Sequence, residues 1–180
     1  MKSNVIKNKK DIQSIKDYLK KTNYRDYVLF TLGINTGLKL KDLLMLKFND
    51  VFDENYVFRE IKVDNQTICL HKNIQQILIH YKELIGDQYD KTYYIFASRK
   101  GKEPIDRSHV YRILNNCAKE LNIHVNLGTQ SMRKTFGYHF YREGGDIKIL
   151  RDKLGHPSCQ ATLKYLEIQR DTFDIQNFYL

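Results

Sequence analysis

The chain has 180 residues, 42% of them hydrophobic, which suits one domain with a sizeable core. Its 28% charged content, and the lack of any apolar run near the roughly 20 residues that span a bilayer, argue against a membrane protein. The 30 lysines and arginines exceed the 21 aspartates and glutamates, so the formal net charge is +9. This excess is typical of nucleic-acid binders, although many basic proteins bind no nucleic acid.

Residues 1–10 are polar and basic with no apolar stretch behind them, so we expect a mobile lead-in rather than a secretory signal. The cysteines Cys69, Cys117 and Cys159 lie far apart and form neither a CxxC pair nor a zinc spacing. We therefore expect three reduced thiols in a cytoplasmic protein.

Helical patterns dominate the first part of the chain. Asp11 is placed to cap a first helix whose apolar residues recur at helical spacing as far as Leu19. A second helix is predicted over residues 24–35 and is ended by Gly37. A third, short helix is predicted over residues 38–46.

The pattern changes near residue 48. Residues 48–52, 56–63 and 67–70 have the composition of three short strands, and turn-forming residues separate them. We therefore predict a mainly α fold with a small antiparallel three-stranded sheet inserted after the third helix.

Helical spacing returns in the second half of the chain. One helix is predicted around residues 74–85, and another follows a Ser108 cap. Residues 86–107 are mostly loop, with a strand-like patch at 93–97. Three further helices are predicted, over residues 132–141, 147–153 and 159–168.

Common enzyme signatures such as GxGxxG, HExxH and GxSxG are missing from the sequence. Arg133 opens a predicted helix, where a guanidinium can hold a phosphate through two parallel hydrogen bonds. His156 lies in the connection between two helices, and Tyr165 follows on the next helix. Tyrosine is a poor nucleophile unless cations stabilise its phenolate. Taken singly, each has an ordinary explanation: a surface arginine, a loop or capping histidine, and a packed tyrosine.

Together these residues resemble the C-terminal signature of the tyrosine recombinases, the phage integrase family. QSMRKTF at 130–136 is similar to His-x-x-Arg-x-Thr-Phe, LGHPS at 154–158 to Leu-Gly-His-x-Ser, and TLKY at 162–165 to Thr-x-x-Tyr. Upstream, TGLKLKDL at 36–43 is similar to the family's first box, Thr-Gly-Leu-Arg-x-x-(Glu/Asp)-Leu. The four matches keep the family's order and cover most of the chain.

The resemblance implies that Tyr165 attacks the scissile phosphate of double-stranded DNA, forms a 3′-phosphotyrosyl bond and frees a 5′-hydroxyl. It implies no cofactor and no metal, because the phosphotyrosyl bond keeps the energy. Carried over by position, Arg133 neutralises the phosphate and His156 hydrogen-bonds a non-bridging oxygen. Lys62, the nearest match on the predicted hairpin to the family's lysine, acts as general acid, typically worth roughly 10²- to 10⁴-fold. The family also implies a bacterial or phage-derived, nucleoid-associated protein.

Two positions depart from the family's pattern. Lys39 replaces the first-box arginine, and lysine lacks the planar fork that grips a phosphate twice. Gln130 replaces a histidine or lysine and has no proton to give away. Each change costs about 3 kcal/mol of transition-state stabilisation, by analogy with the loss of an oxyanion-hole donor. We therefore expect an enzyme that is slow or inactive, or one that has a narrow substrate range.

Two other functions compete with a site-specific recombinase. The departures at Lys39 and Gln130 favour a non-catalytic DNA-binding relative that regulates recombination, whereas Arg133, His156 and Tyr165 oppose it. A helix-turn-helix-like transcription regulator would fit the charge but not the ordered boxes.

The domain organisation follows from the resemblance. About ten residues precede the first predicted helix, too few for the N-terminal clamp domain of many family members, so we expect a catalytic domain alone over residues 11–170. Its DNA binding should be weak and steeply salt-dependent. The apolar tail, residues 171–180, favours docking, either on its own domain or on a neighbouring protomer in a homo-oligomer on DNA.

Overall fold

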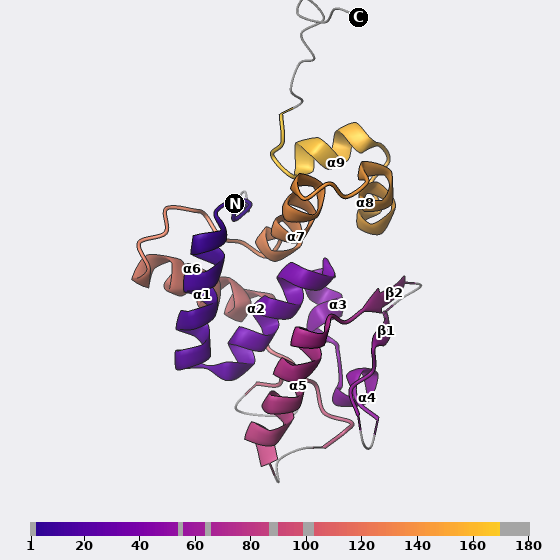
Figure 1. The fold of residues 1–180 in the computed structure, drawn as a ribbon. Coiled ribbons are helices and arrows are strands. Elements are labelled where there is room, and N and C mark those ends of the chain that lie inside the picture. Colours follow the sequence, from indigo (N-terminus) through magenta and orange to yellow (C-terminus); the bar gives the residue numbers. More distant parts are fainter. Residues whose placement is uncertain (1–2, 54–55, 64–65, 87–89, 99–102, 170–180) are drawn as a thin grey trace, which may run out of the picture.

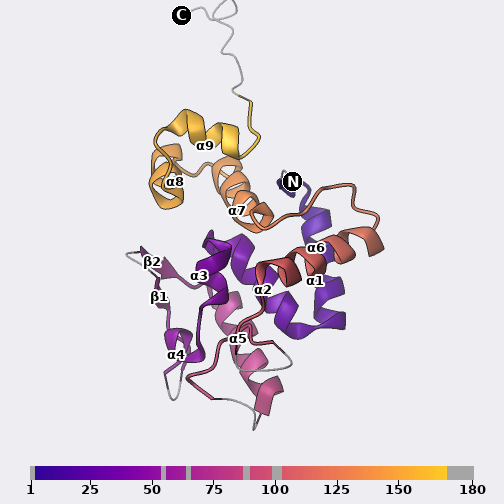
Figure 2. The same ribbon diagram turned by 180° about the vertical axis from the view of Figure 1, so that it is seen from behind.

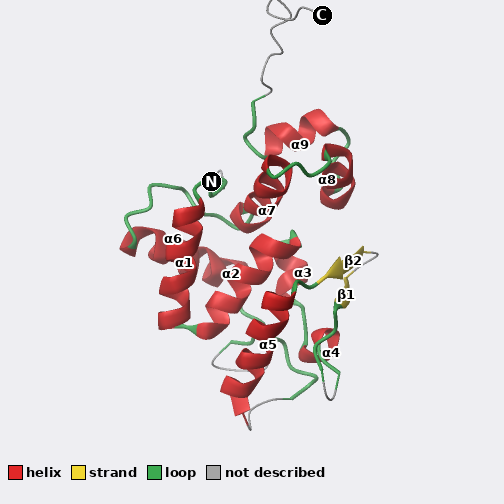
Figure 3. Ribbon diagram, viewed as in Figure 1, coloured by secondary structure: helices red, strands yellow, loops and turns green. Residues whose placement is uncertain are grey.

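The structure, a computed structural model, describes residues 3–53, 56–63, 66–86, 90–98 and 103–169 (Figure 1). The predicted docking tail at 171–180 lies outside the described residues. The elements are α1 (Lys9–Thr22), α2 (Tyr24–Thr36), α3 (Leu40–Leu44), α4 (Phe48–Val51), β1 (Glu60–Val63), β2 (Gln66–Cys69), α5 (Lys72–Ile85), α6 (Arg107–Glu120), α7 (Ser131–Arg142), α8 (Ile147–Leu154) and α9 (Cys159–Tyr165). Figure 3 shows the predicted class, mainly helical with a small antiparallel sheet.

α2 is the central helix and packs against α1, α5 and α7 (Figures 1 and 2). Val28, Leu29 and Phe30 are all buried, because a helix covered on several sides needs apolar residues around most of its surface. Gly33 lets α7 approach closely, since a Cβ there would lie 2.6 Å from the Met132 sulfur. α2 thereby fixes the position of α7, which carries Arg133.

A smaller apolar cluster joins α7, α8 and α9, which lie together at one end of the molecule (Figures 1 and 2). Its buried centre is Leu150, Leu154 and Leu166, and the half-buried Phe136 and Tyr165 pack against it. This cluster sets the position of α9 relative to α7. Among the described residues, no helix is long and apolar enough to cross a membrane.

The prediction of a three-stranded sheet is wrong in its first strand. Residues 48–51 form α4, because the buried apolar residues of this segment recur at i, i+3 and i+4. In the described part of the chain β1 and β2 form a two-stranded antiparallel sheet, with Lys62 opposite Thr67. Of the predicted pairing between residues 48–52 and 56–63, the described residues keep one isolated antiparallel bridge, between Phe52 and Val57.

The predicted mobile lead-in is packed from residue 3 onward. Val5 and Ile6 are buried, and the Ile6 N–H donates to the Thr135 hydroxyl at 3.0 Å. The prediction failed here because it rested on the polar and basic character of the segment, in which these two apolar residues are a small minority. The segment joins α1 to α7 and so belongs to the domain.

Two helix caps differ from the prediction. Asn8 caps α1 instead of Asp11, and Asp106 caps α6 instead of Ser108. Both residues have an extended backbone, and their side chains accept N–H bonds from the first turn of the helix. Each helix therefore begins about one turn or less before the predicted position.

The left-handed ends of α2 and α8 form a matched pair for a stability test. Gly37 ends α2 at φ 65°, as predicted, and Gly155 ends α8 at φ 68°. A Cβ on Gly37 would lie 2.4 Å from the Phe136 ring, whereas a Cβ on Gly155 would meet nothing within 4 Å.

We expect Gly155→Ala to lower the free energy of unfolding by about 1–2 kcal/mol, because only backbone strain is added. Gly37→Ala should lower it by about 2–5 kcal/mol, because overpacking against Phe136 adds to the strain. Denaturant unfolding of both variants measures the difference. Equal losses would contradict the packing role of Gly37.

Candidate active site

A pocket of about 380 Å³ brings together all the predicted site residues except Lys62. It is lined by Lys39, Leu40, Lys41, Arg107, Thr129, Gln130, Arg133, Leu154, His156 and Tyr165. The lining contains four lysine or arginine side chains and no carboxylate. Such a pocket favours an anion.

Arg133 lies in the first turn of α7 and joins three parts of the fold. Its guanidinium donates to the carbonyl oxygen of Gly37, at the end of α2, and to that of Leu154, at the end of α8, at 3.0 Å. Burial lowers the pKa of Arg133, while Tyr165 and Asp42 act in the opposite direction. The arginine is thus a structural junction as well as a cation in the pocket.

Tyr165 is the last residue of α9 and lies beside Arg133 and His156. Its ring contacts the His156 ring edge-on, with 4.8 Å between the ring centroids. Burial raises the pKa of the Tyr165 phenol, and the hydrogen-bonded Arg133 guanidinium only partly offsets this. Tyr165 is therefore a neutral phenol near pH 7, and a nucleophilic attack must remove its proton.

The side chain of Thr162, which is completely buried, determines which ring nitrogen of His156 carries the proton. The Thr162 hydroxyl donates its single proton to the Ser158 carbonyl oxygen at 3.2 Å, so its oxygen accepts from Nδ1 of His156 at 3.1 Å. Burial and the nearby Arg133 lower the pKa of His156, which favours the neutral ring. The neutral ring then presents an unprotonated Nε2.

Lys62 is not among the lining residues of the pocket, and its side chain is exposed on β1. The hairpin nevertheless contacts α8, because the Gln66 side-chain amide donates to the Lys153 carbonyl oxygen at 3.3 Å. Lys153 is a second lysine at this place, and burial followed by repulsion from Arg133 lowers its pKa. Lys153 is therefore a second lysine near Arg133, on the helix that the hairpin contacts.

Sequence reasoning missed Lys41, Arg107 and Thr129 as lining residues. Arg107 is the first residue of α6 and comes to the pocket from a part of the chain that matches none of the four boxes. In the sequence, Thr162 stands out only as the first residue of the last box. No local signal in the sequence marks Arg107, because its proximity to Arg133 arises from the packing of distant helices.

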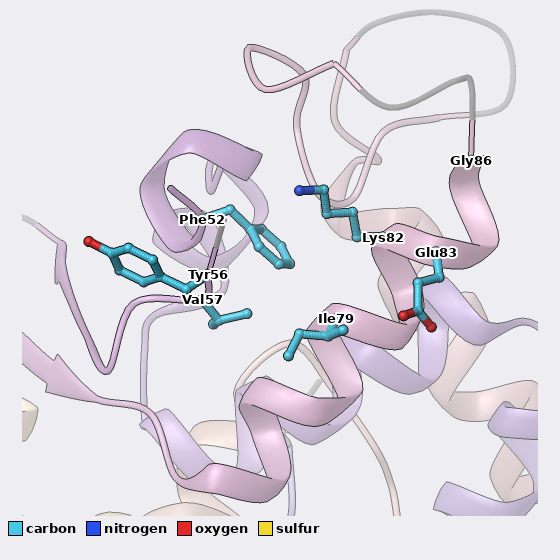
Figure 4. Close-up of a pocket in the computed structure, with 7 residues that line it drawn as sticks. All are labelled: Phe52, Tyr56, Val57, Ile79, Lys82, Glu83 and Gly86. Carbon is cyan, nitrogen blue, oxygen red and sulfur yellow. The ribbon is translucent and has the colours of Figure 1, made fainter. Parts of the chain in front are cut away.

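A second cavity, of about 400 Å³, lies between α5 and residues of the segment that follows α4, and it contains none of the predicted site residues (Figure 4). Phe52, Val57 and Ile79 supply its apolar surface, and the Lys82 ammonium lies 5.1 Å from the centre of the Phe52 ring. We assign it no part in the chemistry. The described residues contain no group of three potential metal ligands of the His, Cys, Asp and Glu types.

The sequence matches the model of the phage integrase family over residues 7–171. It is 35% identical over 170 residues to the probable integrase/recombinase YoeC of Bacillus subtilis, covering 93% of this chain and 91% of that protein. It is 28% identical over 163 residues to tyrosine recombinase XerA of Pyrococcus furiosus. That match covers 88% of this chain but 55% of XerA, so the chain spans about half the length of this relative.

Solved structures give the same fold. The crystal structure of XerA recombinase is similar with a TM-score of 0.77 at 22% identity, covering 94% of this chain and 62% of that one. XerH bound to a palindromic difH substrate gives a TM-score of 0.71 at 17% identity, covering 91% of this chain and 49% of that one. At such identities the likeness supports the fold alone.

Replacing Arg133 should change the titration of Tyr165. In Arg133→Gln the opposing cation is lost while burial remains, so the pKa of Tyr165 should rise further. NMR of ring-¹³C-labelled tyrosine measures this, with the Tyr165 signal identified by its loss in Tyr165→Phe. Arg107→Gln, which changes another arginine of the same pocket, is the control and should leave the pKa of Tyr165 unchanged. A lower pKa in Arg133→Gln would refute the assigned contact.

Proposed function

Because the chain belongs to the phage integrase family, we propose that it is a site-specific recombinase domain that cleaves and rejoins double-stranded DNA through a 3′-phosphotyrosyl intermediate at Tyr165. The observation that carries the proposal is the placement of Tyr165 against Arg133 and His156 in one cationic pocket. A phosphate held there by cations is open to attack by the phenol oxygen. As the bond from this oxygen to phosphorus forms, the bond from phosphorus to the 5′ oxygen breaks. The 5′ oxygen leaves as a hydroxyl with a proton delivered by Lys62, the phenol proton passes to solvent, and the phosphotyrosyl bond keeps the energy for rejoining.

In this proposal the basic lining residues hold the scissile phosphate. Arg133 neutralises it, and Lys39 and Gln130 contribute weaker contacts than the family's usual residues at those positions. When its ring is protonated, His156 donates from Nε2 to a non-bridging oxygen, because its Nδ1–H already donates to the Thr162 hydroxyl oxygen. The negative phosphate favours that protonated ring in the DNA complex.

DNA is the proposed partner, on the strength of the family and of the fold shared with XerH bound to its difH substrate. We place the catalytic domain over residues 11–170, with the packed residues 3–10 contributing to it. Docking of residues 171–180 on a neighbouring protomer stays a prediction, as does a nucleoid location. The rival proposal, a relative that binds DNA without cutting it, rests on Lys39 and Gln130.

Covalent capture of DNA tests the proposal directly. Incubation with a nicked suicide substrate should give a protein–DNA adduct that resists denaturation with the wild type but not with Tyr165→Phe. Tyr141→Phe is the matched control, because Tyr141 packs on the same apolar cluster, and it should form the adduct normally. An adduct in Tyr165→Phe would overturn the nucleophile. Binding without an adduct in the wild type would favour the non-cutting relative.

Restoring the family's residues should speed the reaction. The double variant Lys39→Arg/Gln130→His should form the adduct faster than the wild type by at least about tenfold, since recovery of even half of the roughly 3 kcal/mol expected at one site gives that gain. Single-turnover adduct formation at saturating DNA measures the rate. If the double variant were no faster, the idea that these two residues impair the enzyme would be wrong.

The general acid can be identified with a modified leaving group. Lys62→Ala should slow cleavage of ordinary DNA by roughly 10²- to 10⁴-fold, and a 5′-bridging phosphorothiolate should restore the rate, because a thiolate leaves without a proton. Lys153→Ala is the parallel test, since Lys153 lies near Arg133. Rescue of Lys153→Ala alone would transfer the role to Lys153.

A further inference from the structure

The chain just beyond Tyr165 is held by a largely buried ion pair that no part of the proposed chemistry uses. The Lys134 ammonium on α7 lies 3.0 Å from a Glu167 carboxylate oxygen. Their side chains are only 9% and 20% exposed. A pair this well shielded from water is more strongly coupled than a surface ion pair.

The N-terminal segment, residues 3–7, is bonded to both members of this pair. Lys134 also donates to the Ser3 carbonyl oxygen at 2.8 Å. The Asn4 side-chain amide donates to the second Glu167 carboxylate oxygen, and the Lys7 ammonium donates to the Glu167 carbonyl oxygen, both at 3.4 Å. Two sequence-distant segments therefore meet at one lysine.

The segment is itself fixed to the rest of the domain. The Asn4 N–H donates to the Asn126 carbonyl oxygen at 2.9 Å, and the Ile6 N–H to the Thr135 hydroxyl at 3.0 Å. The His139 ring contacts the Ile6 carbonyl oxygen at 2.9 Å. Residues 3–7 are therefore held in place and can restrict the movement of Glu167.

The ion pair lies directly against the nucleophile. The Lys134 ammonium is 5.2 Å from the centre of the Tyr165 ring. Leu166 is fully buried beside Gly137, and Glu167 has a left-handed φ of 59°. Because α9 has only 7 residues and ends at Tyr165, the position of the phenol depends on what holds the chain immediately after it.

We propose that Lys134 and Glu167, supported by residues 3–7, are positioning residues that hold Tyr165 at its attack position. They touch neither the phosphate nor the leaving group in this account, and act through the backbone and ring of Tyr165. A displacement of about 1 Å at a reacting atom costs roughly 10²-fold in rate. The inference rests on the proposed function, because it needs Tyr165 to be the nucleophile.

Glu167→Gln tests the inference, since it removes the charge and keeps the shape. The rate of covalent adduct formation at saturating DNA should fall by roughly 10²-fold, while the DNA dissociation constant stays within about twofold of the wild type, because the pocket keeps its cations. Asn4→Ala, which removes one support of Glu167, should cause a smaller loss of the same kind.

The exposed pair Lys9–Glu143 supplies a matched control. It joins the start of α1 to the C-terminal cap of α7 at 2.6 Å, with side chains 73% and 61% exposed. Glu143→Gln makes the same chemical change away from Tyr165, so the rate should stay at the wild-type value.

A 5′-bridging phosphorothiolate substrate separates positioning from proton delivery. It relieves the leaving group but not a displaced nucleophile, so Glu167→Gln should stay slow on this substrate. A rate within about twofold of the wild type on ordinary DNA, or full rescue by the phosphorothiolate, would overturn the inference. If Glu167→Gln is unfolded at the assay temperature, Asn4→Ala is judged by the same two criteria.

Tyr165→Phe, assayed in parallel, distinguishes a failure of the proposed function from a failure of the positioning inference. If it still forms the adduct, the proposed nucleophile fails and the inference fails with it. If it forms none while Glu167→Gln matches the wild type, only the positioning inference fails.

Discussion

The architecture of the site depends on one cation placed where three helices end. The Arg133 guanidinium donates to the carbonyl oxygens of Gly37 and Leu154 and lies against the side chain of Tyr165. Gly37 is the C-cap of α2, and Leu154 and Tyr165 are the last residues of α8 and α9. The last carbonyls of a helix have no partner within it and carry a partial negative charge. A single guanidinium, with five donors in a planar fork, satisfies several of them at once. The same side chain therefore assembles the pocket and charges it.

Much of this arrangement is predictable from the sequence because it depends on local patterns. The helical spacing of apolar residues predicts the main helices. Gly37 predicts the end of α2, because the residue after a helix often has a left-handed backbone conformation, which glycine adopts most easily. The ordered boxes predict that Arg133, His156 and Tyr165 meet, and the structure places them in one pocket.

The failures of prediction have physical causes. The segment around α4 has apolar residues whose spacing fits one helical turn as well as a strand, and burial decides for the helix. Val5 and Ile6 are too few to stand out among basic neighbours, yet both are buried. Lys134 and Glu167 are 33 positions apart in the sequence. They meet because of tertiary packing, which local sequence patterns do not predict.

The meeting of Asn4 with Glu167 has a consequence for how the domain matures. These residues are 163 positions apart, so their contact closes one of the longest loops available to the chain. Contacts of such separation form late, because the entropy of loop closure must be overcome before they stabilise anything. During synthesis, Arg133 and His156 are added to the chain before Glu167, so the contact of Asn4 with Glu167, beside Tyr165, cannot form until after both of them are present. The proposed active site is therefore completed only when nearly all of the described residues have been made.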